Sequence, residues 1–100
     1  ARRLDWVIEF NLPAPEERRD LWLAHLGDGH VLEPGELNQL AALADVAGGH
    51  IRNAVLTAAL LARGAARVIT LADCIRGLEA EYRKLGRNLP GGLTAARAHD

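Results

Sequence analysis

Apolar and polar residues follow one another in a pattern that predicts one strand and then several helices. Residues 6–10, Trp-Val-Ile-Glu-Phe, are rich in aromatic and β-branched side chains, and Pro13 and Pro15 follow them. This predicts a short strand and then an extended turn. Beyond the turn, apolar residues recur every three or four positions, which predicts helices over residues 15–26, 36–47, 51–63 and 71–85. With a short extended piece at 67–69, the expected fold class is mainly α, a four-helix bundle with one N-terminal strand.

Three of the predicted helices have a single apolar face, and the first does not. On the first helix, Arg18, Trp22 and His25 share one side. Leu23 and Leu26 lie on another side, and the size of Trp22 suggests that both sides are partly covered. In the other three helices, the residues expected to face inward are Leu37, Leu40, Ala41, Ala44, Ile51, Val55, Ala58, Ala62, Ile75, Leu78 and Tyr82.

Capping residues and glycines mark where helices begin and end. Thr70, with Asp73 three residues later, predicts a capped start for the last helix. Gly48-Gly49 is expected to end the second helix, and Gly86 lies where the last helix should end. After it, Pro90-Gly91-Gly92 and an alanine-rich polar end predict a loosely ordered tail.

Composition suits one small globular domain of 100 residues, of which 49% are hydrophobic and 25% charged. The net charge of −1 gives no general reason to expect a nucleic-acid partner. A single cysteine, Cys74, excludes an internal disulfide and favours a reducing compartment such as the cytoplasm. No apolar run is long enough to span a membrane. The absence of an initial methionine suggests a piece of a longer polypeptide.

The segment 48–52, Gly-Gly-His-Ile-Arg, is the best candidate for a ligand site. Two glycines let a backbone approach a ligand closely, and the start of a helix presents unpaired N–H groups. Arg52 in the first turn would add positive charge and donors suited to a phosphate group. The alternative is that Arg52 is a surface arginine paired with a carboxylate, with the glycines serving only to end a helix.

Other polar residues offer weaker candidates. No metal site is expected, and Cys74 is expected to fill space in the core. Residues 79–84 are expected to form a solvated helix face with Tyr82 pointing inward, and His50 to be a surface histidine. The histidines, none of which has a neighbour at metal-ligand spacing, are His25, His30, His50 and His99.

Three segments, in their order and spacing, resemble the C-terminal lid of an AAA+ ATPase with the last strand of its nucleotide-binding core attached. They are Arg2-Arg3-Leu4-Asp5, then Leu12-Pro13 with Glu17-Arg18-Arg19 and Leu21-Trp22, and finally Gly49-His50-Ile51-Arg52-Asn53-Ala54. The resemblance covers about residues 2–86. It implies that residues 1–11 end the ATPase core, that 12–86 form the helical lid, and that 87–100 are a flexible tail.

The resemblance also implies roles for individual residues. Arg52 matches the sensor 2 arginine, which reaches the γ-phosphate of ATP, and Gly49 and Ile51 match residues near the adenine and ribose. Gly48 and His50 complete the segment expected at the nucleotide. Arg2 or Arg3 matches the arginine finger, which acts on ATP held by a neighbouring subunit. The alternative for this pair is a solvated chain end, or an ion pair of Arg3 with Asp5 or a core carboxylate.

The function implied is that of a nucleotide-sensing lid within a larger enzyme. The chain has no Gly-x-x-x-x-Gly-Lys-Ser/Thr loop and no acidic Walker B strand, so it should not hydrolyse ATP or bind ATP or ADP tightly alone. In the full-length protein the cofactor would be ATP or ADP with Mg²⁺. The expected partners are the ATPase core, neighbouring subunits of a ring that is usually hexameric, and a macromolecule to be remodelled.

Two other classes of function stay open. One is a stand-alone helical module that binds another protein through an exposed apolar groove, for which Arg52 would be dispensable. The other is a small helical DNA-binding domain, against which near-neutral charge and a Gly-Gly turn with few polar side chains both argue. The lid hypothesis itself predicts exposed apolar surface around Trp6, Val7 and Ile8, because a lone strand cannot pair its own edges.

Overall fold

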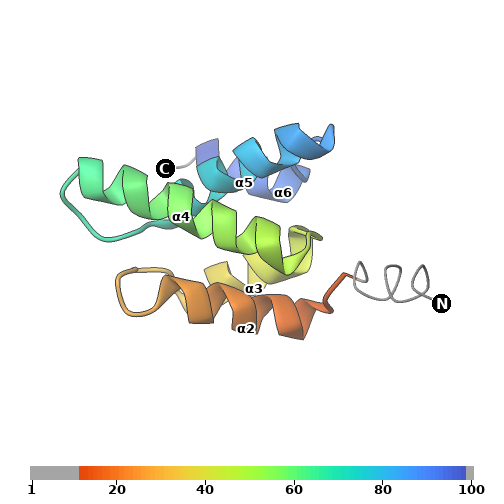
Figure 1. The fold of residues 1–100 in the computed structure, drawn as a ribbon, viewed down its shortest axis with the longest axis horizontal. Helices are drawn as coiled ribbons and strands as arrows, with labels where there is room; N and C mark the ends of the chain where they lie inside the picture. Colours follow the sequence, from red (N-terminus) through yellow and green to blue (C-terminus); the bar gives the residue numbers. More distant parts are fainter. Residues whose placement is uncertain (1–11, 99–100) are drawn as a thin grey trace, which may run out of the picture.

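Five helices follow one another in the computed structural model, which describes residues 12–98. They are α2 (Pro15–Leu26), α3 (Pro34–Leu43), α4 (Gly48–Gly64), α5 (Leu71–Leu85) and α6 (Gly91–Ala98). The longest, α4, lies between α2 and α5, and α6 contacts both α3 and α5 (Figure 1). The expected mainly helical fold class is confirmed, with α6 added to the four predicted helices. The strand expected at residues 6–10 lies outside the described part of the chain.

The apolar faces predicted from the sequence meet in one core. Every residue expected to face inward on α3, α4 and α5 is buried. On α2 the buried residues are Arg18, Trp22 and Leu26, at intervals of four. Leu26 was expected on a different side from Arg18 and Trp22 but is buried with them, because the buried stripe of α2 follows every fourth residue, and His25 is exposed.

The closest helix contact is that between α4 and α5, where Gly77 faces Ala54. A Cβ atom added at Gly77 would lie 2.9 Å from the Cα and carbonyl carbon of Ala54, and closer still to its oxygen. A glycine here lets the two backbones approach, and small residues on the inward face of α4, such as Ala58 and Ala62, have the same effect. The packing of α4 on α5 therefore depends on one position without a side chain.

The connection between α3 and α4 differs from the prediction. α3 begins two residues early, since Pro34 occupies its first position and the carboxylate of Glu36 accepts a 2.8 Å hydrogen bond from the N–H of Glu33. It ends at Leu43, and α4 begins at Gly48. The prediction that Gly48-Gly49 ends the preceding helix is therefore wrong, because these glycines form the first turn of α4.

Both predicted boundaries of α5, unlike those of α3, agree with the structure. Thr70 and Asp73 cap α5 reciprocally, with the Asp73 carboxylate accepting from the Thr70 N–H at 3.0 Å. Gly86 follows α5 in the left-handed conformation, at φ 67°.

The short extended piece before α5 pairs with the connection that follows α2. Ile69 donates from its N–H to the carbonyl of Gly29 at 2.9 Å and accepts from the N–H of Val31 at 3.0 Å. The resulting parallel bridge joins His30 and Ile69, outside any named strand.

The segment after Gly86, expected to be loosely ordered, includes a helix in the structure. α6 covers Gly91–Ala98, and Leu93 on it is fully buried in the core. The carbonyl of Pro90 accepts hydrogen bonds from the N–H groups of Leu93 and Thr94, which start the helix. One buried leucine among small residues is a weak signal in sequence, so the helix was missed.

Candidate functional site

The start of α4 presents backbone donors that nothing in the described part of the chain satisfies. Ala47 precedes the helix in an extended conformation and supplies no side-chain cap. Its carbonyl accepts from the N–H groups of His50 and Ile51, at 3.0 and 3.2 Å. The N–H groups of Gly48 and Gly49 have no acceptor among the described residues, and no acidic residue lies in the first turn. These amides and the helix dipole together favour an anion.

Arg52 lies one turn further along, with its side chain exposed. Within residues 12–98 it forms no hydrogen bond or ion pair, so the carboxylate partner that a purely surface role would suggest is not found there. Ile51 beside it is fully buried and anchors this turn of α4 to the core. Gly49 is exposed, with open space where a Cβ would be. The structure therefore brings Gly49 and Arg52 to the surface of one short segment and places Ile51 in the core.

His50 is more than a surface histidine, because its ring is held by a buried carboxylate. Nδ1 of His50 lies 2.8 Å from Oε1 of Glu81, a residue of α5. A carboxylate can only accept, so Nδ1 carries the hydrogen and donates it. The His50 side chain is 28% exposed, whereas that of Glu81 is 2% exposed.

Glu81 is a residue whose role the sequence did not reveal. The expectation that residues 79–84 form a solvated face is wrong at this position, because Glu81 is buried beside Tyr82. Asn53 Nδ2 also donates to it, at 3.3 Å, and Lys84 Nζ donates at 2.6 Å. Burial raises the pKa of Glu81, but the donors Lys84, His50 and Asn53 outweigh it and lower the pKa below its ordinary value. The signal in the sequence was its spacing of three from Leu78 on the inward face.

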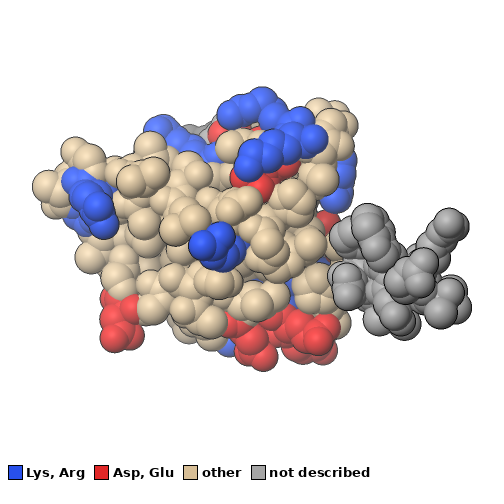
Figure 2. Space-filling model, in the orientation of Figure 1, with Lys and Arg blue, Asp and Glu red and all other residues tan. Residues whose placement is uncertain are grey.

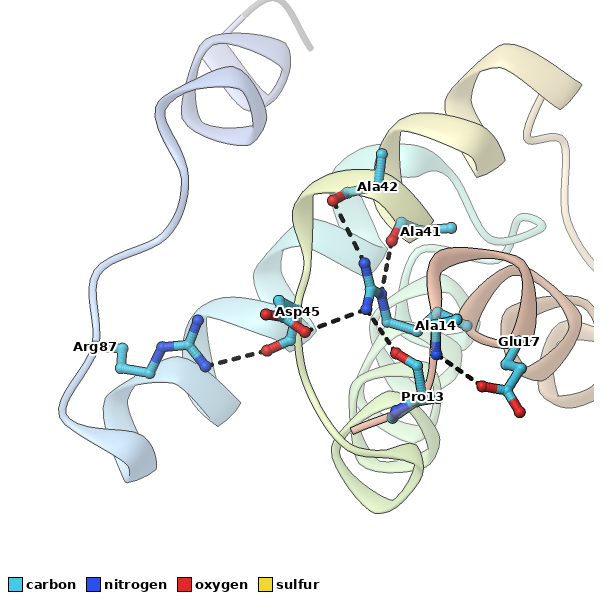
Figure 3. A network of polar contacts seen from close by, with 8 residues as sticks. Pro13, Ala14, Glu17, Ala41, Ala42, Asp45 and Arg87 are labelled. Carbon is cyan, nitrogen blue, oxygen red and sulfur yellow. Dashed lines mark hydrogen bonds and ion pairs between the residues drawn. The ribbon is translucent and has the colours of Figure 1, made fainter. Parts of the chain in front are cut away.

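A second buried charge, Arg18, determines where α3 ends. Only 4% of Arg18 is exposed. Its Nε donates to the carbonyl of Ala41 at 2.7 Å and its Nη2 to that of Ala42 at 3.5 Å. Nη1 donates to the carbonyl of Pro13 at 2.8 Å and to the carboxylate of Asp45 at 3.1 Å (Figure 3). Arg18 thus satisfies carbonyls that the last turn of α3 leaves unpaired.

Asp45 is held from its other side by Arg87, which follows α5. Nη1 of Arg87 donates to the Asp45 carbonyl at 3.1 Å (Figure 3). The guanidinium of Arg87 also lies 4.9 Å from the centre of the Tyr82 ring. Burial is the main cause that raises the pKa of Tyr82. Asp45 belongs to the short segment that leads into Gly48, so Arg18 and Arg87 together fix the approach to the start of α4.

Charged residues are unevenly distributed around the helices. Figure 2 shows lysine and arginine side chains gathered near α5 and acidic side chains along the edge formed by α2, with a largely uncharged surface over α4. Two leucines of α4, Leu56 and Leu60, are exposed to solvent, and Leu60 is 67% exposed. They follow Arg52 at intervals of four, so the exposed side of α4 combines a cation with apolar area.

The remaining candidates lie in the core or outside the described residues. Cys74 is buried, as expected for a packing residue, and burial raises the pKa of its thiol to about 12. Among the described residues no group of histidine, cysteine and acidic side chains could hold a metal ion. Arg2 and Arg3, expected near a neighbouring subunit, and the apolar residues at 6–8 lie outside residues 12–98.

Two further findings concern membrane-spanning helices and known proteins. No helix within the described residues is both long and apolar enough to cross a membrane. Comparison of the sequence with models of known families, with curated proteins and with solved structures found no match.

Proposed function

We propose that this chain is the nucleotide-sensing lid of an AAA+ ATPase, in which Arg52 contacts the γ-phosphate of ATP. The observation that carries the proposal is the exposed Arg52, which has no partner among the described residues and lies one turn after a helix start without a side-chain cap. The order of sequence segments that resembles such lids is its second support.

The start of α4 has the chemistry that a phosphate group needs. The N–H groups of Gly48 and Gly49, which find no acceptor within residues 12–98, are oriented donors, and the positive end of the helix dipole adds to them. A guanidinium contributes charge and paired donors that match phosphate oxygens. Gly49 leaves room for close approach, since nothing lies within 4 Å of its missing side chain.

In this proposal the lid moves as one body because α4 is fixed within it. Ile51 is fully buried, and α4 is packed against α2 and α5. The lid closes over ATP when Arg52 meets the γ-phosphate, and hydrolysis removes that contact. The resulting rotation against the ATPase core moves neighbouring subunits in a ring, which we take to be hexameric, and remodels a bound macromolecule.

The catalytic machinery itself belongs to the rest of the enzyme. Residues 1–100 carry no phosphate-binding loop, so the core domain supplies it and holds ATP with Mg²⁺. Arg2 or Arg3 serves as the arginine finger in the same proposal. The cytoplasm is the compartment proposed, because the only cysteine of the chain is a buried thiol.

A second candidate function is supported by the exposed leucines of α4. Leu56 and Leu60 give this face apolar area that another protein could cover, as in a stand-alone interaction module. In that case the chain binds its partner without nucleotide, and Arg52 contributes no more than a rim charge.

The test is steady-state ATP hydrolysis by the natural polypeptide that contains this chain, with Arg52→Ala compared with Arg63→Ala. Arg63 is exposed on the same helix, three turns away, and is the matched control. Arg52→Ala should lower kcat on the order of 10²-fold, as expected for loss of one donor to developing charge, with Arg63→Ala close to wild type. Equal rates for the two variants, or no ATPase activity in the natural polypeptide, would refute the lid proposal.

A further inference from the structure

Glu81 stands out because its carboxylate is buried on α5, whereas a leucine at this position would avoid the free-energy cost of removing a charge from water. Taking a carboxylate out of water is expensive, and its attraction to partners often only repays that cost. Here the partners come from two helices, with His50 and Asn53 on α4 and Lys84 on α5 itself. The hydrogen bonds keep the carboxylate ionised, so the bonds to α4 are charge-assisted.

The two α4 partners of Glu81 lie in the part of α4 that carries the candidate site. His50 is the third residue of α4, and Asn53 lies one turn after it, so the two flank Ile51 and Arg52 in sequence. Ala47 gives the helix start no side-chain cap, and the first turn begins with two glycines, which have high conformational freedom. A fraying first turn would lose the orientation of the amides of Gly48 and Gly49 and of the Arg52 side chain.

We propose that Glu81 is a positioning residue, which holds the first turns of α4 in the geometry that binds the ATP phosphates. It acts through His50 and Asn53 and touches no ligand itself. The inference rests on the proposed function, since it adds to that function the residue that orders its site.

A matched control lies at the other end of α5. Asp73 is also a buried carboxylate, and it accepts from Arg67, whose Nη2 lies 3.0 Å from Oδ1. Arg67 belongs to the connection between α4 and α5, so it lies next to the end of α4 and not near its start. Glu81→Gln and Asp73→Asn each remove one buried charge while keeping shape, so both lose stability, and they differ in which end of α4 they release.

The experiment measures KM and kcat for ATP in the natural polypeptide, together with hydrogen exchange at the amides of His50 and Ile51, which donate to the Ala47 carbonyl in the first turn of α4. Glu81→Gln should raise KM for ATP about tenfold, a size typical of losing a supporting hydrogen bond behind a ligand-binding group, and should speed exchange at these amides. Asp73→Asn should leave both near wild type.

The outcomes separate the inference from the function on which it rests. If Arg52→Ala lowers the rate while Glu81→Gln and Asp73→Asn change KM equally, or neither changes it, the positioning role is wrong and the lid proposal survives. If Arg52→Ala has no effect, or the natural polypeptide does not hydrolyse ATP, both proposals are wrong. Unchanged exchange at the amides of His50 and Ile51 in Glu81→Gln would also overturn the positioning role.

Discussion

Arg18 on α2 donates a 2.7 Å hydrogen bond to the carbonyl of Ala41, 23 residues further along the chain. The side chain of one helix thereby completes the end of the next, α3, which finishes at Leu43 without a glycine. Helices usually solve this problem locally, with a glycine or a basic residue in their own last turn. The solution found here joins α2 and α3 at the point where the chain turns toward α4.

Replacing Arg18 should therefore destabilise the chain more than replacing its neighbour. Arg18→Ala leaves the carbonyl of Ala41 buried and unpaired and also removes the weaker bond to the carbonyl of Ala42, and we expect a loss of about 2–4 kcal/mol in the free energy of unfolding. Arg18→Lys should recover little, because a single ammonium cannot reach the same set of acceptors. Urea unfolding measures both losses.

The control is Arg19→Ala, since Arg19 is more exposed and its side chain has Asn38, at 2.6 Å, as its one hydrogen-bond partner in the described part of the chain. That change should cost less than about 1 kcal/mol. Equal losses for the variants at positions 18 and 19 would show that the buried network does not hold α2 to α3.

A methyl group at position 77 should separate α4 from α5. The Cβ of Gly77→Ala would press against backbone atoms of Ala54, which cannot rotate away as a side chain can. The expected loss is about 1–3 kcal/mol, although alanine is the better helix former. Thermal or urea unfolding gives the value.

Gly64→Ala is the comparison for this effect, because Gly64 is also helical and nothing lies within 4 Å of its missing Cβ. It should be neutral or slightly stabilising. If Gly77→Ala also proved neutral, the close approach of the two helices would not be a requirement of the fold.

The stability of the chain should fall in acid in part because of Asp73. Its hydrogen bonds to Arg67 are the main cause that lowers its pKa below the ordinary value of 3.8, although burial opposes them. A carboxyl whose pKa is lowered by folding stabilises the folded state fully above its unfolded pKa, and that contribution is lost as pH falls through the folded pKa. The expected window is thus below about pH 4.

Urea unfolding of wild type and Asp73→Asn at a series of pH values between about 2 and 7 tests this expectation. The difference in stability between the two should shrink as pH falls below the ordinary pKa of aspartate. A difference that stays constant with pH would mean that the charge of Asp73 contributes nothing beyond its shape.

The inward apolar faces of the helices could be predicted from the sequence, whereas the hydrogen bonds of the buried charged side chains could not. Ile51, Val55 and Ala58 recur at helical spacing, so their burial follows from local pattern alone, and the same is true of the inward faces of α3 and α5. Arg18 and Glu81 occupy inward positions in such patterns although they are charged. Partners 23 to 31 residues away help to satisfy each of them, and no local rule reveals those distant partners.

The sequence could mark the residues of the candidate site as a group, but it could not show where in the fold they lie. The glycines and Arg52 form one short segment, so the sequence could mark them as a group. The same two glycines were expected to end α3, because glycine serves at either end of a helix and the sequence does not distinguish the two roles. Asp45 and Arg87 are 42 residues apart, and only the fold brings them together before Gly48.

The hydrogen bonds from Arg18 to the last turn of α3 also have a consequence for the order of folding. α3 has 10 residues, fewer than an isolated helix needs to persist in water. Since its last carbonyls are completed from α2, α3 should gain its final turn only when α2 has docked, and the two should cross the folding barrier as one unit. Helix α3 is in this sense formed as much by its neighbour as by its own sequence.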